Sequence, residues 1–221
     1  MDNFWEGFNY GATGWFFMWT LLVVAAFMIA VTIERFIYIF SVSKINVPLF
    51  MAQIRKAVTA RDYKKAITYC SAVKDKALPQ VVLAGLLKAS KMSTPDFRSV
   101  QNAVDESTLE IIPKLQARTN YLALIGNIAT LIGLLGTIFG LMEAFEAVSE
   151  GVAKGALEAG QGSEQLTRGI ATAMNTTFLG LAVAIPAISF YTIIHNKTNQ
   201  IIDEIDEHLV KLINLITREK D

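Results

Sequence analysis

The chain has little that enzymatic catalysis or covalent cross-linking would need. Its 221 residues include one cysteine, Cys70, and two histidines. A single cysteine excludes an intrachain disulfide, and we expect Cys70 to be a small buried hydrophobe. No cluster of His, Cys or acidic residues has metal-ligand spacing, and no nucleophile stands beside a base. We therefore expect no enzyme and no bound cofactor.

Charge is missing from three long windows. Lys, Arg, Asp and Glu are absent from residues 7–33, 119–142 and 169–196, in a chain that is 52% hydrophobic. A bilayer core is crossed by about 20 apolar residues in a helix. The first window follows no basic residue and is too long for a signal peptide. The sequence therefore predicts an all-α integral membrane protein with three transmembrane helices.

The distribution of Lys and Arg gives the orientation. Basic residues gather between 41 and 120, whereas acidic residues dominate 143–168. The positive-inside rule then places the N-terminus outside and the C-terminus inside. We predict an external segment at 1–14, spans at 15–40, 121–146 and 169–194, a cytoplasmic helical domain at 41–120, an external loop at 147–168 and a cytoplasmic helix at 195–221. The net charge is zero and by itself says nothing about partners. We expect the lipid bilayer and other membrane proteins as partners, and no nucleic acid.

Helix signals recur in the cytoplasmic segment. Asp62 is a candidate N-cap, Pro79 begins or bounds a helix that runs to Lys91, and residues 93–96 combine capping residues with a proline. No glycine follows until Gly126. We therefore expect one long helix from there into the membrane, bent at Pro113.

Three further local features carry predictions. We expect Arg35 to extend towards the interface rather than form a buried ion pair. The glycine-rich stretch 149–163 predicts a flexible or helix-breaking connector. Pro186 predicts a kink in the third span.

The tail has apolar residues at spacings of 3, 4, 3 and 4: Ile202, Ile205, Leu209, Leu212 and Ile216. This rhythm is typical of a coiled-coil contact between copies. It equally fits a helix that docks on its own cytoplasmic domain. We slightly favour self-association.

Small residues repeat in the second and third spans. Gly126, Gly133 and Gly140 recur every seven residues, Gly136 and Gly140 form a GxxxG pair, and Gly180 lies in the third span. Small residues on one face let membrane helices approach closely. We assign these glycines to helix packing.

The same two spans carry polar groups. The second span has Asn127, Thr130 and Thr137 on one side, and the third has Thr172, Asn175, Thr176 and Thr177. One threonine can bond back to its own helix. So many polar groups in adjacent spans favour a polar pore or helix interface over scattered back-bonded hydroxyls. A proton relay usually needs a titratable group, so a proton-conducting protein of this kind would take its carboxylate from another chain.

Two stretches, Gly133-Leu-Leu-Gly-Thr-Ile-Phe-Gly-Leu-Met142 and residues 169–186, resemble the paired motifs of the MotA/TolQ/ExbB proton channel family. The three-helix layout is similar to the ExbB/TolQ branch. The resemblance implies an inner-membrane homopentamer around a dimer of single-helix ExbD/TolR/MotB-like partners, each with an aspartate. Proton flow past that aspartate would drive mechanical work in envelope transport, with a TonB/TolA-like transducer as a further candidate partner. Thr137 and Thr177 match the family's pore threonines.

Two departures from the family pattern matter. Thr172 stands where ExbB and TolQ proteins usually have a glutamate. Thr176 stands where proton-driven members often have alanine, and the Thr176–Thr177 pair resembles sodium-driven members. Oxygen atoms of Thr137, Thr176 and Thr177 could ligate a hard cation. We keep H⁺ as the expected ion, Na⁺ as the alternative, and a non-conducting membrane scaffold as an alternative of another class.

Overall fold

The computed structural model describes Phe8 and residues 15–92, 95–153 and 161–217, and the regular secondary structure of this part is α-helical. Three helices in these ranges are long and apolar enough to cross a membrane, which confirms the predicted fold class. The predicted external segment 1–14 lies outside the described residues except for Phe8. The chain forms two compact units: unit 1 holds 1–33 and 118–192, and unit 2 holds 34–117 and 193–221.

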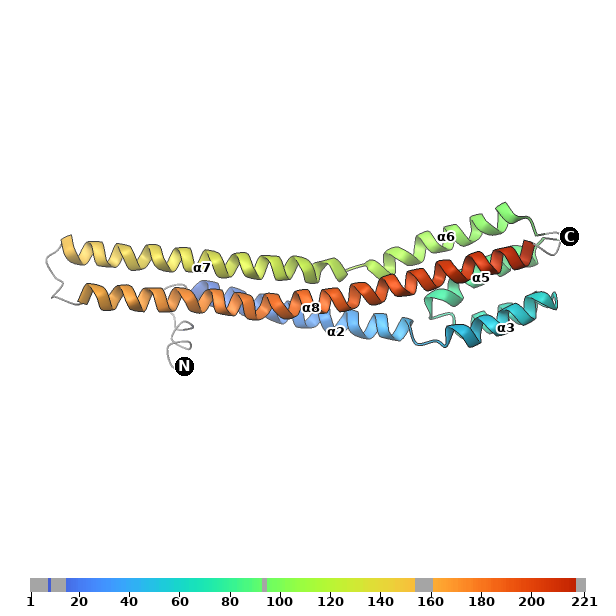
Figure 1. Cartoon of the computed structure of the whole chain (residues 1–221), viewed down its shortest axis with the longest axis horizontal. Coiled ribbons are helices and arrows are strands. Elements are labelled where there is room, and N and C mark those ends of the chain that lie inside the picture. The colour runs from blue at the N-terminus through green and yellow to red at the C-terminus, as the bar shows by residue number, and fades with distance from the viewer. Residues whose placement is uncertain (1–7, 9–14, 93–94, 154–160, 218–221) are drawn as a thin grey trace. The chain divides into compact units, whose positions relative to one another are not determined.

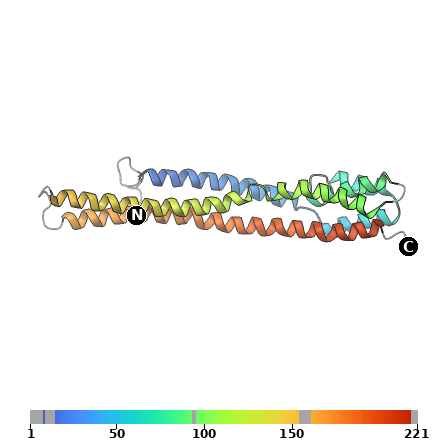
Figure 2. The same cartoon turned by 90° about the horizontal axis from the view of Figure 1, so that it is seen from above.

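Unit 1 is built from α2 (Trp15–Val42), α7 (Thr119–Ala153) and α8 (Gln161–Thr217), of which α2 and α8 continue into unit 2. In unit 1, α7 and α8 lie side by side (Figure 1, Figure 2) and antiparallel, since Gly126 meets Ile188 whereas Gly140 meets Ala173. An apolar cluster joins all three helices: Leu21, Ala129, Val183 and Ala184.

The α7–α8 pair extends beyond the predicted spans. Helix α7 continues to Ala153 and α8 already begins at Gln161, so Gly151 and Gly162 lie inside helices. The expected connector at 149–163 is therefore too long, and only 154–160 remains outside the described residues. Packing between neighbouring helices outweighs the weak helix propensity of glycine at such positions.

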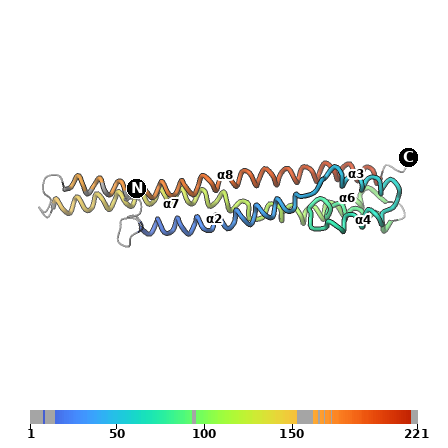
Figure 3. Tube along the Cα trace, turned by 90° about the horizontal axis from the view of Figure 1, so that it is seen from below, coloured from blue at the N-terminus to red at the C-terminus, as the bar shows by residue number. Residues whose placement is uncertain are grey.

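After the end of α2, unit 2 continues with shorter helices, each packed on the next: α3 (Val47–Thr59), α4 (Tyr63–Ala72), α5 (Ala77–Ser90) and α6 (Phe97–Gln116). Figure 3 shows this part of the trace folding back on itself. The predicted cap is confirmed, because the Asp62 side chain accepts a hydrogen bond from the Lys65 N–H at 3.0 Å. The predicted helix from Pro79 to Lys91 corresponds to α5.

The start of α6 differs in detail from the expectation. Asp96 is the N-cap and accepts from the Ser99 N–H at 3.3 Å. Pro95 precedes this cap, and residues 93 and 94 lie outside the described residues. A carboxylate cap also complements the positive end of the helix dipole.

The expected continuous helix through Pro113 is wrong. Pro113 lies inside α6, which ends at Gln116, and α7 starts at Thr119. Between them Arg118 has φ +59°. This left-handed conformation stops a right-handed helix, and it usually belongs to glycine. Because arginine gives no such signal, the sequence pattern suggested an uninterrupted helix.

The tail of α8 corrects another expectation. Ile205, Leu209, Leu212 and Ile216 are all buried within the single chain, and Ile202 is half-buried. Their apolar side chains are already covered by unit 2, which is the second of the two alternatives left by the sequence. The preference for self-association through this stripe was wrong.

Arg35 is also placed differently from its prediction. Its side chain is buried rather than extended to an interface, with Nη2 3.7 Å from the Glu34 carboxylate. The guanidinium lies 5.0 Å from the centre of the Tyr38 ring. A buried arginine commonly combines an ion pair with an aromatic contact, because both offset its lost hydration.

Candidate ion path

The contact between α7 and α8 in unit 1 depends on glycine. A Cβ atom on Gly133 would lie 3.1 Å from the carbonyl oxygen of Thr176 and 3.3 Å from Cα of Gly180. A Cβ on Gly180 would lie 2.7 Å from the carbonyl oxygen of Ala129. Backbone atoms cannot turn aside as side chains do. At this level the helices therefore touch main chain to main chain.

The other interface glycines face side chains. A Cβ on Gly126 would lie 2.7 Å from Cγ1 of Ile188, and one on Gly140 would lie 2.9 Å from Cβ of Ala173. One on Gly136 would lie 2.7 Å from the Thr176 hydroxyl oxygen. Gly169, which the sequence analysis did not single out, meets Ala144 in the same way.

Two threonines of α8 direct their hydroxyls at one carbonyl of α7. The Thr177 hydroxyl donates to the Gly133 carbonyl oxygen at 3.0 Å. The Thr176 hydroxyl lies 3.3 Å from the same oxygen and 2.7 Å from the Ala173 carbonyl of its own helix. Thr176 is buried and Thr177 half-buried. Close packing at Gly133 brings this carbonyl within reach of both hydroxyls.

The polar groups of α7 lie beside this interface. The Thr137 hydroxyl donates to the Leu134 carbonyl at 2.6 Å, and the Thr130 hydroxyl to the Gly126 carbonyl at 3.0 Å. Thr137 is half-buried, whereas Thr130 and Asn127 are exposed. Both hydroxyls are thus satisfied within their helix, yet their oxygen lone pairs remain able to accept from water or a ligand.

Three further candidate residues lie on α8. Asn175 is half-buried, and the side chain of Thr172 lies outside the described part of the chain. Pro186 is half-buried inside α8, and the helix continues past it.

The interface is polar yet carries no charge of its own. Residues 119–142 of α7 and 169–194 of α8 contain no Asp, Glu, Lys, Arg or His. Hydroxyl and carbonyl oxygens can solvate a passing cation but cannot release a proton near neutral pH. A proton path along this interface would need a titratable group from outside these two spans.

The convergence on the Gly133 carbonyl is a site feature that sequence reasoning missed. Hydroxyls were identified by residue type, whereas their acceptor is a backbone atom of a glycine. The sequence signals were that Gly133 belongs to a repeat of small residues in the second span and that the third span carries a threonine pair.

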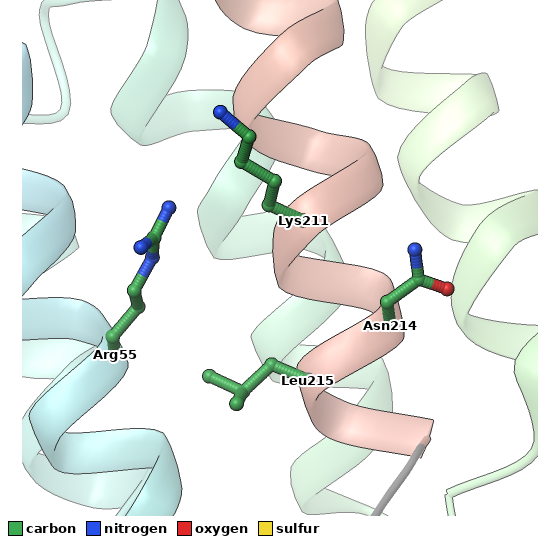
Figure 4. Close-up of a pocket in the computed structure, with 4 residues that line it drawn as sticks. All are labelled: Arg55, Lys211, Asn214 and Leu215. Atoms are coloured by element: carbon green, nitrogen blue, oxygen red, sulfur yellow. The ribbon is translucent and has the colours of Figure 1, made fainter.

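Unit 2 contains a separate basic cleft, with a volume of about 330 Å³, lined by Arg55, Lys211, Asn214 and Leu215. Figure 4 shows Arg55 and Lys211 on opposite walls. Lys211 forms an ion pair with Glu207, and this hydrogen-bonded ammonium lowers the pKa of the Glu207 carboxyl. Of the two basic side chains at the cleft, the charge of Lys211 is therefore already balanced by Glu207.

Within the described residues, three apolar helices are long enough to cross a membrane, and a glycine interface between two of them brings uncharged polar groups together, as in an integral membrane protein. A profile of the MotA/TolQ/ExbB proton channel family matches residues 73–207, more than half of the chain, and the protein belongs to that family. The family is one of non-enzymatic transport proteins that work in complexes and carry H⁺. No curated protein matches the chain.

Proposed function

We propose that this chain is the channel-forming subunit of an ExbB/TolQ-type motor in the bacterial inner membrane. It assembles as a homopentamer around an aspartate-bearing dimer of ExbD/TolR/MotB-like single helices. Proton flow along α7 and α8 then drives mechanical work for an envelope transport process, through a TonB/TolA-like transducer where that process requires one. Membership of the proton channel family supports the general class.

One observation carries the proposal: Thr177 and Thr137 lie on either side of a closely packed interface that has no titratable group. Thr177 Oγ1 is 3.0 Å from the Gly133 carbonyl, and Thr137 is the next turn of the same helix. A proton crossing these spans needs an acid that they do not contain. The aspartate of a partner helix supplies that acid.

The position of α2 leaves the polar face open to such a partner. The Phe17 and Phe139 rings are 5.6 Å apart, so α2 packs on the side of α7 that bears Phe139. Two helical positions differ by about 200°, so Thr137 points to nearly the opposite side. A partner helix can therefore approach Thr137 without displacing α2.

The orientation follows the distribution of charge. We propose an external N-terminus and a cytoplasmic unit 2, because basic residues gather between 41 and 120. Sodium is the alternative ion. The Thr176–Thr177 pair is the sequence feature that resembles sodium-driven members, and the half-buried Thr177 hydroxyl is the more accessible of the two oxygens for a hard cation.

The experiment is proton flux into proteoliposomes that contain the chain and its co-purified partner. Thr137→Val and Thr177→Val each remove a hydroxyl and keep the side-chain volume, and we expect flux to fall about tenfold or more. Thr20→Val is the matched control, because the Thr20 hydroxyl bonds to the Phe16 carbonyl within α2. It should leave flux unchanged.

The non-conducting scaffold makes the opposite prediction. Assembly would survive both substitutions, and neither the wild-type complex nor any variant would carry ions. Wild-type flux that persists after Thr137→Val and Thr177→Val would reject these two residues as the ion path. Total ion current, measured in sodium and then in potassium, separates the two ions, because only a sodium-coupled complex loses its current when sodium is replaced.

A further inference from the structure

Thr176 is the most enclosed polar side chain of the α7–α8 interface. Its relative exposure is 1%, against a half-buried Thr177. Its hydroxyl oxygen is 2.7 Å from the Ala173 carbonyl and 3.3 Å from the Gly133 carbonyl. A hydroxyl has one proton, and here two backbone oxygens compete for it. A cation would have to displace α7 to reach this oxygen.

Gly136 is the reason for this enclosure. A Cβ atom on Gly136 would lie 2.7 Å from Oγ1, 2.8 Å from Cβ and 3.2 Å from Cγ2 of Thr176. All three side-chain atoms beyond Cα are thus within contact of one position on α7. The bare backbone at Gly136 is what makes room for Thr176.

This contact differs from its neighbours in what determines the helix separation. At Gly133 the nearest atoms are backbone atoms of α8, and at Gly140 the nearest is the Cβ of Ala173. Of the three positions Gly133, Gly136 and Gly140, only Gly136 faces a side chain longer than that of alanine, which is Thr176. The volume of residue 176 therefore influences how α7 and α8 meet along this part of the interface.

Both pore candidates depend on that fit. Thr177 follows Thr176 directly and bonds to Gly133, while Thr137 follows Gly136. A change in the separation at Gly136 and Thr176 moves both hydroxyls relative to each other. Displacements of about 1 Å are enough to impair a transfer reaction.

We propose that Thr176 is a positioning residue: its side chain fills the space that Gly136 leaves and so sets the positions of Thr137 and Thr177, and its hydroxyl does not ligate the ion. This inference rests on the ion path proposed above. On this inference Thr176 determines the spacing of the two helices and does not determine whether the channel carries sodium or protons.

The test compares volume with chemistry at position 176, using flux per assembled complex in proteoliposomes. Thr176→Val keeps the volume and removes the hydroxyl, so flux and its dependence on pH and sodium should match wild type. Thr176→Leu and Gly136→Ala each add bulk at the contact, and we expect flux per complex to fall about tenfold or more. Gly136→Ala combined with Thr176→Gly restores the room and should recover most of it.

Gly126→Ala is the matched control. Its new methyl group would lie 2.7 Å from Cγ1 of Ile188, so it also adds bulk to the interface, but Gly126 and Ile188 are each eleven residues along their helices from Thr137 and Thr177. It should therefore cost much less flux than Gly136→Ala. If Gly136→Ala does not assemble, Thr176→Val and Thr176→Ser still show whether the Thr176 hydroxyl ligates the ion, because neither variant adds bulk at the contact.

Three results would overturn the proposal. One is a shifted sodium or pH midpoint in Thr176→Val that Thr176→Ser does not show, because that pattern identifies a ligating hydroxyl. Another is wild-type flux in both Gly136→Ala and Thr176→Leu. A third is an equal loss in Gly126→Ala. Absent flux in the wild-type complex would instead reject the proposed ion path itself, before any variant is compared.

Discussion

The hydroxyl of Thr177 on α8 donates to the carbonyl of Gly133 on α7, 44 residues earlier, at 3.0 Å. The bond is only within reach because neither Gly133 nor Gly180 has a side chain to separate the helices. The sequence singles out Thr177 for its hydroxyl and Gly133 for its small size, and this bond links the two.

This bond should contribute measurably to stability. Thr177→Val removes the donor and should lower the unfolding free energy by about 1 kcal/mol, whereas Thr177→Ser should keep most of it. The readout is thermal unfolding in detergent. Thr192→Val is the control, since the Thr192 hydroxyl is exposed and bonds only to the Ile188 carbonyl of its own helix. Equal effects of Thr177→Val and Thr192→Val would contradict an interhelical role.

The break between α6 and α7 should be stabilised by glycine. Arg118 adopts φ +59°, which disfavours any residue with a Cβ. Arg118→Gly and Arg118→Ala both lose the arginine side chain, so their difference isolates the backbone term. We expect the glycine variant to be more stable than the alanine variant by about 1 kcal/mol. The comparison is made by chemical or thermal unfolding, and a more stable alanine variant would contradict the left-handed conformation.

The tail should behave as part of the core of unit 2. Leu212 is 1% exposed, and Leu212→Ala should lower stability by about 2–5 kcal/mol. Val210, two residues earlier, is 60% exposed, and Val210→Ala should change stability by less than about 0.5 kcal/mol. Unfolding measurements compare the stability of the two variants. Size-exclusion chromatography with light scattering then shows whether either variant changes the oligomeric state. If Leu212→Ala dissociates the complex but leaves the stability of unit 2 unchanged, the apolar residues of the tail would instead serve self-association.

Cys70 should resist alkylation in the folded protein. Burial raises the pKa of its thiol to about 12, so almost no thiolate exists at pH 8–9. We expect iodoacetamide to label it only after denaturation, as measured by mass spectrometry. Rapid labelling of the folded protein at pH 8 would contradict the buried position.

The same burial makes stability depend on pH. An unfolded thiol ionises near pH 8.5, so above that pH the unfolded state binds fewer protons than the folded state. Stability should therefore fall as pH rises from about 9 towards 12, by at most about 1.4 kcal/mol per unit from this group. Cys70→Ala should lack that contribution, and identical pH profiles for the two proteins would exclude it.

Much of the architecture follows from local chemistry. Windows without charge determine three spans, because a charged side chain is costly in hydrocarbon. Asp62 predicts its helix start because a short acceptor side chain satisfies a free N–H wherever it occurs. The glycine repeat and the threonine pair also appear directly in the sequence, together with the family resemblance that the profile match then confirms.

The tertiary structure decided what no local pattern carries. The break at Arg118 uses a conformation that arginine adopts only when its surroundings enforce it. The apolar stripe of the tail had two permissible partners, and only the packing of unit 2 shows that its own chain covers Ile205 and Leu212.

The sequence by itself determined that hydroxyls lie in uncharged spans and that a titratable group for proton transfer must come from outside these spans. Only the structure decided which atoms they meet: the Gly133 carbonyl for Thr177, and the space over Gly136 for Thr176. The physical reason is that residue type fixes hydrogen-bonding capacity, whereas the partner depends on an approach of two helices that residues 40 positions apart create together.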